Sequence, residues 1–81
     1  MTLLYTPQAV KQLNQLSLSE KRKIVRKLEL LIDEPFIGKL LKGNLTGIRS
    51  LRAWPYRILY TLTKDATIVY SIAHRQSVYK K

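Results

Sequence analysis

The chain has 81 residues, no cysteine, and a formal net charge of +10 from 15 Lys and Arg residues against 5 Asp and Glu residues. This length predicts one small domain, residues 1–81, and the lack of cysteine excludes disulfide bonds and thiolate metal sites. No apolar run approaches the ~18 residues of a membrane span and no signal peptide is recognisable, so we expect a cytoplasmic protein without a membrane partner.

The N-terminal part of the sequence predicts a strand followed by a helix. Residues 3–5 are apolar or aromatic and suit a short first strand. Thr6 is suited to cap a helix N-terminus, and Pro7 fits the first helical position because its missing N–H costs nothing there. Three apolar residues then recur at helical spacing: Val10, Leu13 and Leu16.

A second helix follows after a short break. Ser17 and Glu20 have the spacing of a capping box, and the helix is expected to end before Pro35, since a residue that precedes proline avoids the helical region. Its predicted apolar stripe comprises Ile24, Leu28 and Leu31, widened by Val25 and Ile32. The two helices are therefore expected to form an antiparallel hairpin.

The second half of the sequence predicts β-structure. Residues 36–47 contain three glycines and are interpreted as a loop. Three strands are then expected over residues 48–54, 56–63 and 67–73, joined by short turns into an antiparallel meander. The order β-α-α-β-β-β predicts a two-layer α+β domain, with the helical hairpin packed on one face of an antiparallel sheet and the other face free to be functional.

Positive charge is concentrated in this second half. Residues 37–81 hold nine of the 15 cations and only one carboxylate, Asp65. Alternation along the middle strand, residues 56–63, separates Arg57 from its more apolar neighbours. Alternation along the preceding strand, residues 48–54, places Arg49 on the face opposite Arg52. A basic surface without counter-charge destabilises the compact state by self-repulsion. A polyanionic partner relieves that cost, which makes RNA the natural candidate.

Two segments carry a resemblance to a known family. Residues 51–60, LRAWPYRILY, and residues 72–79, IAHRQSVY, strongly resemble the RelE/ParE toxin superfamily. The upstream stretch, with a helical hairpin, Pro35 and the segment 39–52, is also similar to that family. The resemblance covers nearly the whole chain and implies the RelE-like fold, which agrees with the element order expected from the residues.

The resemblance implies one of two activities. RelE-like members are endoribonucleases that cut mRNA in the ribosomal A site, whereas ParE-like members inhibit DNA gyrase and are not nucleases. By motif position, Arg57, Arg75 and Tyr79 match catalytic residues of the RelE type, and His74 matches a position that is basic or histidine in many ribonuclease members. RelE has two lysines at alternate positions of the first functional strand, where this sequence has Ile48 and Ser50.

The RelE-type reaction needs no metal or cofactor if side chains supply the positive charge. The RNA 2′-OH must lose a proton, the charge on the phosphorane must be stabilised, and the leaving 5′-oxygen must be neutralised. Arg57 and Arg75 are candidates for holding the phosphate because a guanidinium binds its oxygens bidentately. Tyr79, with a lowered pKa, and His74 are both candidates for the base.

Other cations are expected to contribute to RNA binding. These are Arg49, Arg52, Lys39, Lys42, Lys80 and Lys81. The cations of the second helix, residues 21–27, are interpreted mainly as its solvated face. The expected function is therefore a toxin that cleaves mRNA on the ribosome and is neutralised by an antitoxin with an acidic segment. The alternatives are a ParE-like gyrase inhibitor and a nucleic-acid-binding domain that has lost catalysis.

Overall fold

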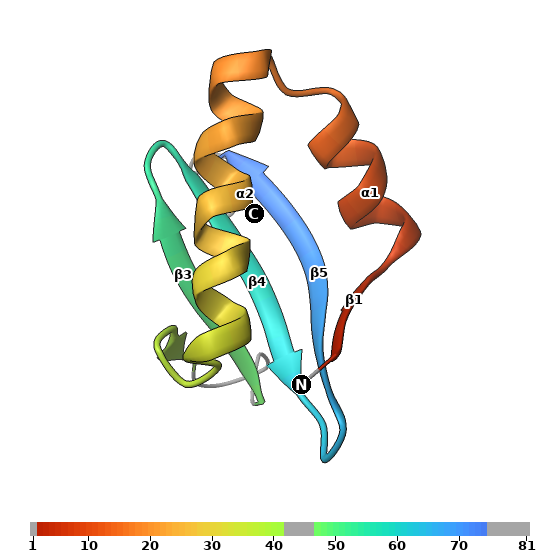
Figure 1. The fold of residues 1–81 in the computed structure, drawn as a ribbon, viewed down its shortest axis with the longest axis vertical. Helices are drawn as coiled ribbons and strands as arrows, with labels where there is room; N and C mark the ends of the chain where they lie inside the picture. Colours follow the sequence, from red (N-terminus) through yellow and green to blue (C-terminus); the bar gives the residue numbers. More distant parts are fainter. Residues whose placement is uncertain (1, 42–46, 75–81) are drawn as a thin grey trace.

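The computed structural model describes residues 2–41 and 47–74, which form two helices and a five-stranded sheet. In chain order the elements are β1 (Thr2–Tyr5), α1 (Pro7–Asn14), α2 (Leu18–Asp33), β2 (Lys39–Leu40), β3 (Ile48–Ala53), β4 (Tyr56–Leu62) and β5 (Ala66–His74). Both helices lie on the same face of the sheet (Figure 1). This arrangement confirms the predicted two-layer α+β fold. In the described part of the chain, neither helix has the length and apolarity that a membrane span requires.

The sheet has the strand order β1-β5-β4-β3-β2 and is mixed. β3, β4 and β5 form the predicted antiparallel meander. The expectation of an entirely antiparallel sheet was wrong, because β1 pairs with β5 in parallel. A short strand, β2, also lies in the segment predicted as a loop and pairs with β3. Its two residues are too few to show an alternating pattern in the sequence.

The helix boundaries follow the local signals in the sequence. Thr6 is the N-cap of α1, and its side chain accepts a hydrogen bond from the Ala9 amide at 3.1 Å. Ser17 caps α2 in the same way, accepting from the Glu20 amide at 3.4 Å. α2 ends at Asp33, two residues before Pro35. The predicted caps and the predicted end of the second helix are therefore confirmed.

α1 is fastened to the edge of β5 beyond the end of β1. The Thr6 amide donates to the Val69 carbonyl at 3.0 Å, which continues the parallel pairing by one residue. Farther along, the Ile72 amide donates to the Gln12 side-chain oxygen at 2.7 Å. These bonds satisfy backbone groups that an edge strand would otherwise leave unpaired. Residues of α1 and its N-cap therefore pair with the part of β5 that lies beyond the end of β1.

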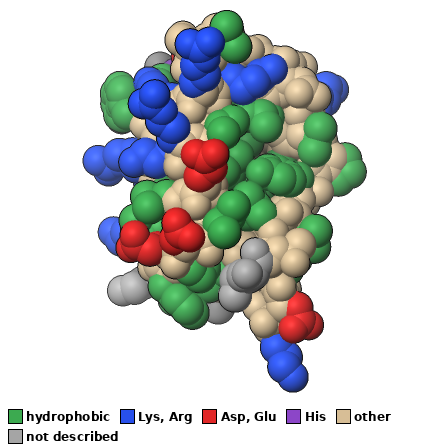
Figure 2. All heavy atoms as spheres, viewed as in Figure 1, with side chains coloured by type: hydrophobic (Ala, Val, Ile, Leu, Met, Phe, Trp, Pro, Cys, Tyr) green, Lys and Arg blue, Asp and Glu red, His purple; other side chains and the backbone are tan. Residues whose placement is uncertain are grey.

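The core lies between α2 and the centre of the sheet. Its buried members include Ile24, Leu28 and Leu31 from α2 and Leu51, Ile58, Val69 and Ile72 from the sheet. On α1 it is Ala9 that is fully buried, whereas Val10, expected on the apolar stripe, is 45% exposed. Val25 and Ile32 are also exposed. Because the sheet lies under one side of the helices only, the outer margins of both stripes remain at the surface, as the apolar band in Figure 2 shows.

A buried tyrosine fixes the path of the chain after α2. The Tyr60 hydroxyl donates to the Pro35 carbonyl at 2.8 Å and accepts from the Gly38 amide at 2.8 Å. A Cβ atom added to Gly38 would lie 2.5 Å from the Tyr60 hydroxyl oxygen and 2.7 Å from its ring. Glycine is therefore required for this close approach, which delivers the chain to β2.

Candidate nucleic-acid interface

The sheet face that points away from the helices carries two arginines in directly opposed positions. Arg52 on β3 pairs with Arg57 on β4. Directly paired residues project from the same face with Cβ atoms ~4.5–5.5 Å apart. Two positions along β3, Ser50 projects from the same face, and the Arg57 guanidinium donates to its hydroxyl at 3.4 Å. Lys39 on β2 pairs with Ser50 and is exposed, so Lys39, Ser50, Arg52 and Arg57 form one group, here called the uncovered basic face.

The electrostatics of the uncovered basic face favour an anionic ligand. Like charges directly opposite each other in a sheet are destabilising. All five carboxylates of the chain lie elsewhere, four of them on α2 or at its C-cap and the fifth, Asp65, in the β4–β5 turn. A phosphate between the two guanidinium groups would reduce their mutual repulsion and accept hydrogen bonds from both.

Arg49 lies on the other side of the sheet and has a structural role. Its guanidinium donates to the Phe36 carbonyl at 3.3 Å and to the Gly38 carbonyl at 2.9 Å, and it lies 5.0 Å from the centre of the Phe36 ring. The expected separation of Arg49 from Arg52 is therefore confirmed. These contacts hold the segment between α2 and β2 in place and direct the Arg49 guanidinium away from the uncovered basic face.

His74 also lies on the helix side. It pairs with Tyr56, and the two rings pack edge to face with centroids 5.5 Å apart. The Tyr56 hydroxyl donates to the Glu20 carboxylate at 3.0 Å. Burial raises the pKa of Tyr56, and the hydrogen bond and charge of Glu20 raise it further. The structure therefore places His74 beside Tyr56, on the face of the sheet opposite the one from which Arg57 projects.

Five predicted site residues lie outside the described residues: Lys42, Arg75, Tyr79, Lys80 and Lys81. Their roles stay predictions. Ser50 was not predicted as a member of the site. Its position two residues before Arg52 on the same strand indicates that the two side chains project from the same face. Within residues 2–41 and 47–74, no three His, Asp or Glu side chains gather as the ligands of a metal ion do.

Comparison with known proteins identifies the family. The model of the ParE toxins of type II toxin–antitoxin systems, parDE, matches residues 3–79. The chain belongs to this family. The match spans nearly the whole toxin and confirms the resemblance to the RelE/ParE superfamily that residues 51–60 and 72–79 indicated. A search of curated proteins gives no match.

Solved structures share the fold of this toxin. A chain of the RelBE2 toxin–antitoxin complex from Mycobacterium tuberculosis is 28% identical, with a TM-score of 0.82 over 91% of this chain and 96% of that chain. The YoeB dimer from Staphylococcus aureus is 26% identical, with a TM-score of 0.74 over 91% and 95%. A chain of the Escherichia coli RelBE complex, at 19% identity and a TM-score of 0.75 over 90% and 94%, shows the fold alone.

Proposed function

We propose that this toxin is an endoribonuclease that cleaves mRNA in the ribosomal A site and thereby halts translation in the cytoplasm. The observation that carries the proposal is the opposed pair of Arg52 and Arg57 on a sheet face without carboxylates. The structural similarity to RelBE2 and YoeB chains above 25% identity supports it. Ser50 occupies a position where RelE has a lysine. In this toxin, Arg52 on the same strand and Lys39 on the neighbouring strand supply positive charge beside that position.

In the proposed mechanism the arginines act on the scissile phosphate. Arg57 and Arg75 bind its non-bridging oxygens and stabilise the charge that develops as the 2′-oxygen attacks phosphorus and the bond to the 5′-oxygen breaks. The departing 5′-oxygen takes a proton from solvent water. Since His74 packs against Tyr56 on the other side of the sheet, we assign the 2′ proton to Tyr79. A phenolate at neutral pH requires a pKa about three units below ~10, or roughly 4 kcal/mol of differential stabilisation. In the proposed mechanism, guanidinium groups close to the Tyr79 phenol would supply such a shift.

The proposed protein partner is an antitoxin with an acidic segment. Relatives of similar fold are found in toxin–antitoxin complexes, RelBE2 from Mycobacterium tuberculosis and YoeB–YefM from Staphylococcus aureus. The net charge of +10 makes an acidic segment complementary to this toxin. Such a segment would fold on binding, with its ordering cost offset by the desolvated contacts it makes.

A second candidate function is inhibition of DNA gyrase. It is favoured by the family model, which is named for ParE toxins. In that case the uncovered basic face has a binding role only, and neither a 2′-OH nor a general base is involved.

Transcript mapping after induction distinguishes the two. Primer extension is expected to reveal new 5′ ends within coding sequences when the toxin is induced, and to lose them when translation initiation is blocked beforehand. Arg57→Ala should abolish the new ends, whereas Lys64→Ala, which removes an exposed turn cation, should leave them unchanged. Growth arrest with intact transcripts and accumulated gyrase–DNA complexes would reject the nuclease and select the gyrase function.

A further inference from the structure

Residues 21–27 of α2 carry a second concentration of positive charge. Its cations are Lys21, Arg22, Lys23, Arg26 and Lys27. Figure 2 shows Lys and Arg side chains gathered over this part of the helix, with carboxylates farther along. α2 lies on the sheet face opposite the one from which Arg52 and Arg57 project. The toxin therefore has two cationic surfaces on opposite sides of the molecule.

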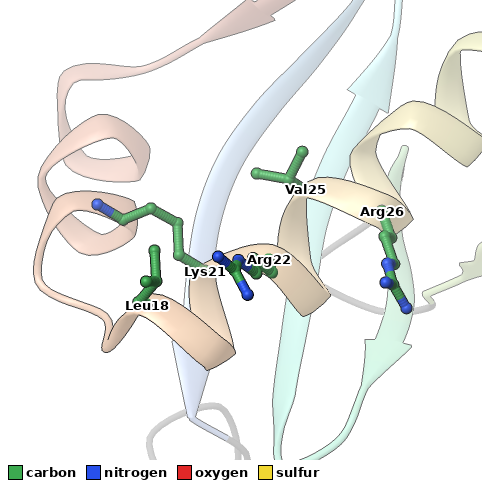
Figure 3. A pocket seen from close by; sticks show the side chains of 5 residues that line it. All are labelled: Leu18, Lys21, Arg22, Val25 and Arg26. Atoms are coloured by element: carbon green, nitrogen blue, oxygen red, sulfur yellow. The ribbon is translucent and has the colours of Figure 1, made fainter.

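Two shallow grooves flank this part of α2, and they differ in chemistry. Arg22 and Arg26 line both grooves. The first groove also has Leu18 and Val25 in its lining, and Lys21 extends from it toward α1 (Figure 3). The second, here called the α2 basic groove, is lined by polar side chains: Ser19, Arg22, Lys23, Arg26 and Lys27. Protein partners anchor mainly through aromatic and apolar groups buried in pockets, whereas Lys, Arg and Ser are usual contacts of phosphate. The α2 basic groove therefore suits a nucleic-acid backbone better than a protein segment.

Two pairs of these cations are unfavourable for the helix itself. Arg22 and Arg26 lie four residues apart, as do Lys23 and Lys27, and like charges at this spacing destabilise a helix. Cations stabilise the last turn of a helix through the macrodipole, yet the last turn of α2 has none. The nearby Glu20 carboxylate accepts hydrogen bonds from two hydroxyl groups of other residues. A local conflict of this kind is typical of a functional surface.

The α2 basic groove is connected to the uncovered basic face through the β3–β4 turn. The Lys23 ammonium donates to the Trp54 carbonyl in that turn at 3.0 Å. Arg52 and Arg57 lie on either side of the same turn, one on each of the strands that it joins. A polyanion that passes around this end of the molecule therefore contacts both surfaces.

We propose that the α2 basic groove binds the phosphate backbone of duplex RNA adjoining the strand that is cleaved. This inference rests on the proposed function, which identifies the polyanion as RNA. The groove holds two rows of cations with members about 6 Å apart along the helix axis, so that several phosphates are contacted together. Phosphate contacts position a nucleic acid without reading its sequence. The groove thus orients the RNA while the uncovered basic face acts on the scissile linkage.

The test is equilibrium binding of a labelled RNA duplex of roughly 20 base pairs over about 50 to 300 mM KCl. The full chain carries Arg57→Ala throughout to suppress cleavage. The double variant R22Q/R26Q is compared with K11Q/K64Q, which removes the same charge from exposed positions on α1 and in the β4–β5 turn. The loss of two phosphate contacts should reduce the slope of log affinity against log salt by about 2. Affinity near 100 mM should fall at least about tenfold for R22Q/R26Q and less than about twofold for K11Q/K64Q.

Equal losses in the two double variants would overturn the inference, since binding would then follow net charge alone. It would also be overturned if poly-glutamate, and not the duplex, bound in a manner that depended on Arg22 and Arg26, because the groove would then accept an acidic protein segment. Cleavage is measured separately with the otherwise unaltered chain. Absence of cleavage together with the expected binding pattern would refute the nuclease and leave the RNA-binding groove supported.

Discussion

Arg52 and Arg57 face each other across the β3–β4 ladder, with the Arg57 guanidinium also hydrogen-bonded to Ser50. In a sheet that served stability alone, one of the two positions would carry a carboxylate or a neutral residue, because opposed like charges are destabilising. The arrangement is explained if an anion lies between them in the functional complex. The central claim is accordingly that the uncovered basic face holds the phosphate at which RNA is cut.

Removing one charge of this pair should separate activity from stability. Arg52→Gln is expected to lower RNA cleavage at least tenfold, as loss of a phosphate-binding group typically does. The free energy of unfolding should stay the same or rise by about 0.2–1 kcal/mol, because the repulsion with Arg57 is relieved. Cleavage assays and urea denaturation measure the two effects.

Lys64→Gln is the matched control for this experiment. Lys64 is exposed in the β4–β5 turn, so both cleavage and stability should remain close to those of the unaltered protein. A loss of more than about 1 kcal/mol of stability in Arg52→Gln would mean that the pair is structural.

Substitution of Arg49 should lower stability and leave RNA binding almost unchanged, the reverse of the result expected for Arg52. Arg49→Lys removes the guanidinium group, one nitrogen of which donates to both the Phe36 and the Gly38 carbonyls. Hydrogen bonds to charged groups contribute roughly 1.5–3 kcal/mol, so a loss of about 1–2 kcal/mol of unfolding free energy is expected. Affinity for a short single-stranded RNA should change less than about twofold, because the total charge is unchanged. A large loss of affinity with unaltered stability would place Arg49 in the RNA site after all.

The Tyr60 hydroxyl should contribute more to the free energy of unfolding than the hydroxyl of an exposed tyrosine. Tyr60→Phe leaves the buried Gly38 amide and the Pro35 carbonyl without their partner. Leaving such a group unsatisfied costs about 1–3 kcal/mol, which chemical denaturation would measure. Tyr70→Phe, at a position 42% exposed, should change stability by less than about 0.5 kcal/mol. Equal effects of the two substitutions would contradict this interpretation.

The raised pKa of Tyr56 gives stability a dependence on alkaline pH. Burial, and then the hydrogen bond and charge of Glu20, raise this pKa above 10.0 in the native state. The native protein thus keeps a proton that the unfolded chain releases, and the stabilisation is present below pH ~10 and lost as pH rises through the native pKa. Urea denaturation at pH 8–11.5 should show a shallower alkaline decline for Tyr56→Phe than for the unaltered protein. Since Tyr5 and Tyr60, whose pKa values are also raised by burial, titrate in both proteins, identical declines would exclude Tyr56 as a contributor.

The sequence predicted the elements whose signals are local. Thr6 and Ser17 cap their helices, α2 ends before Pro35, and alternation separated Arg49 from Arg52 as observed. The parallel pairing of β1 with β5 was missed, because two helices and three strands separate these two segments in the chain, and no local pattern reveals their pairing. Of the candidate site residues, alternation placed Arg57 apart from its apolar neighbours, as observed. Its pairing with Arg52 and the location of His74 opposite Tyr56 depend on strand register, which no local pattern encodes.

The most direct test uses purified ribosomes stalled with a message whose A-site codon carries either ribose or a single 2′-deoxyribose at the cleavage position. The unaltered toxin should cut the ribose-containing message and leave the 2′-deoxy message intact, and Arg57→Ala should cut neither. Cleavage of both messages, or undiminished cleavage by Arg57→Ala, would contradict the claim that the uncovered basic face assists attack by the 2′-oxygen on a phosphate held at Arg57.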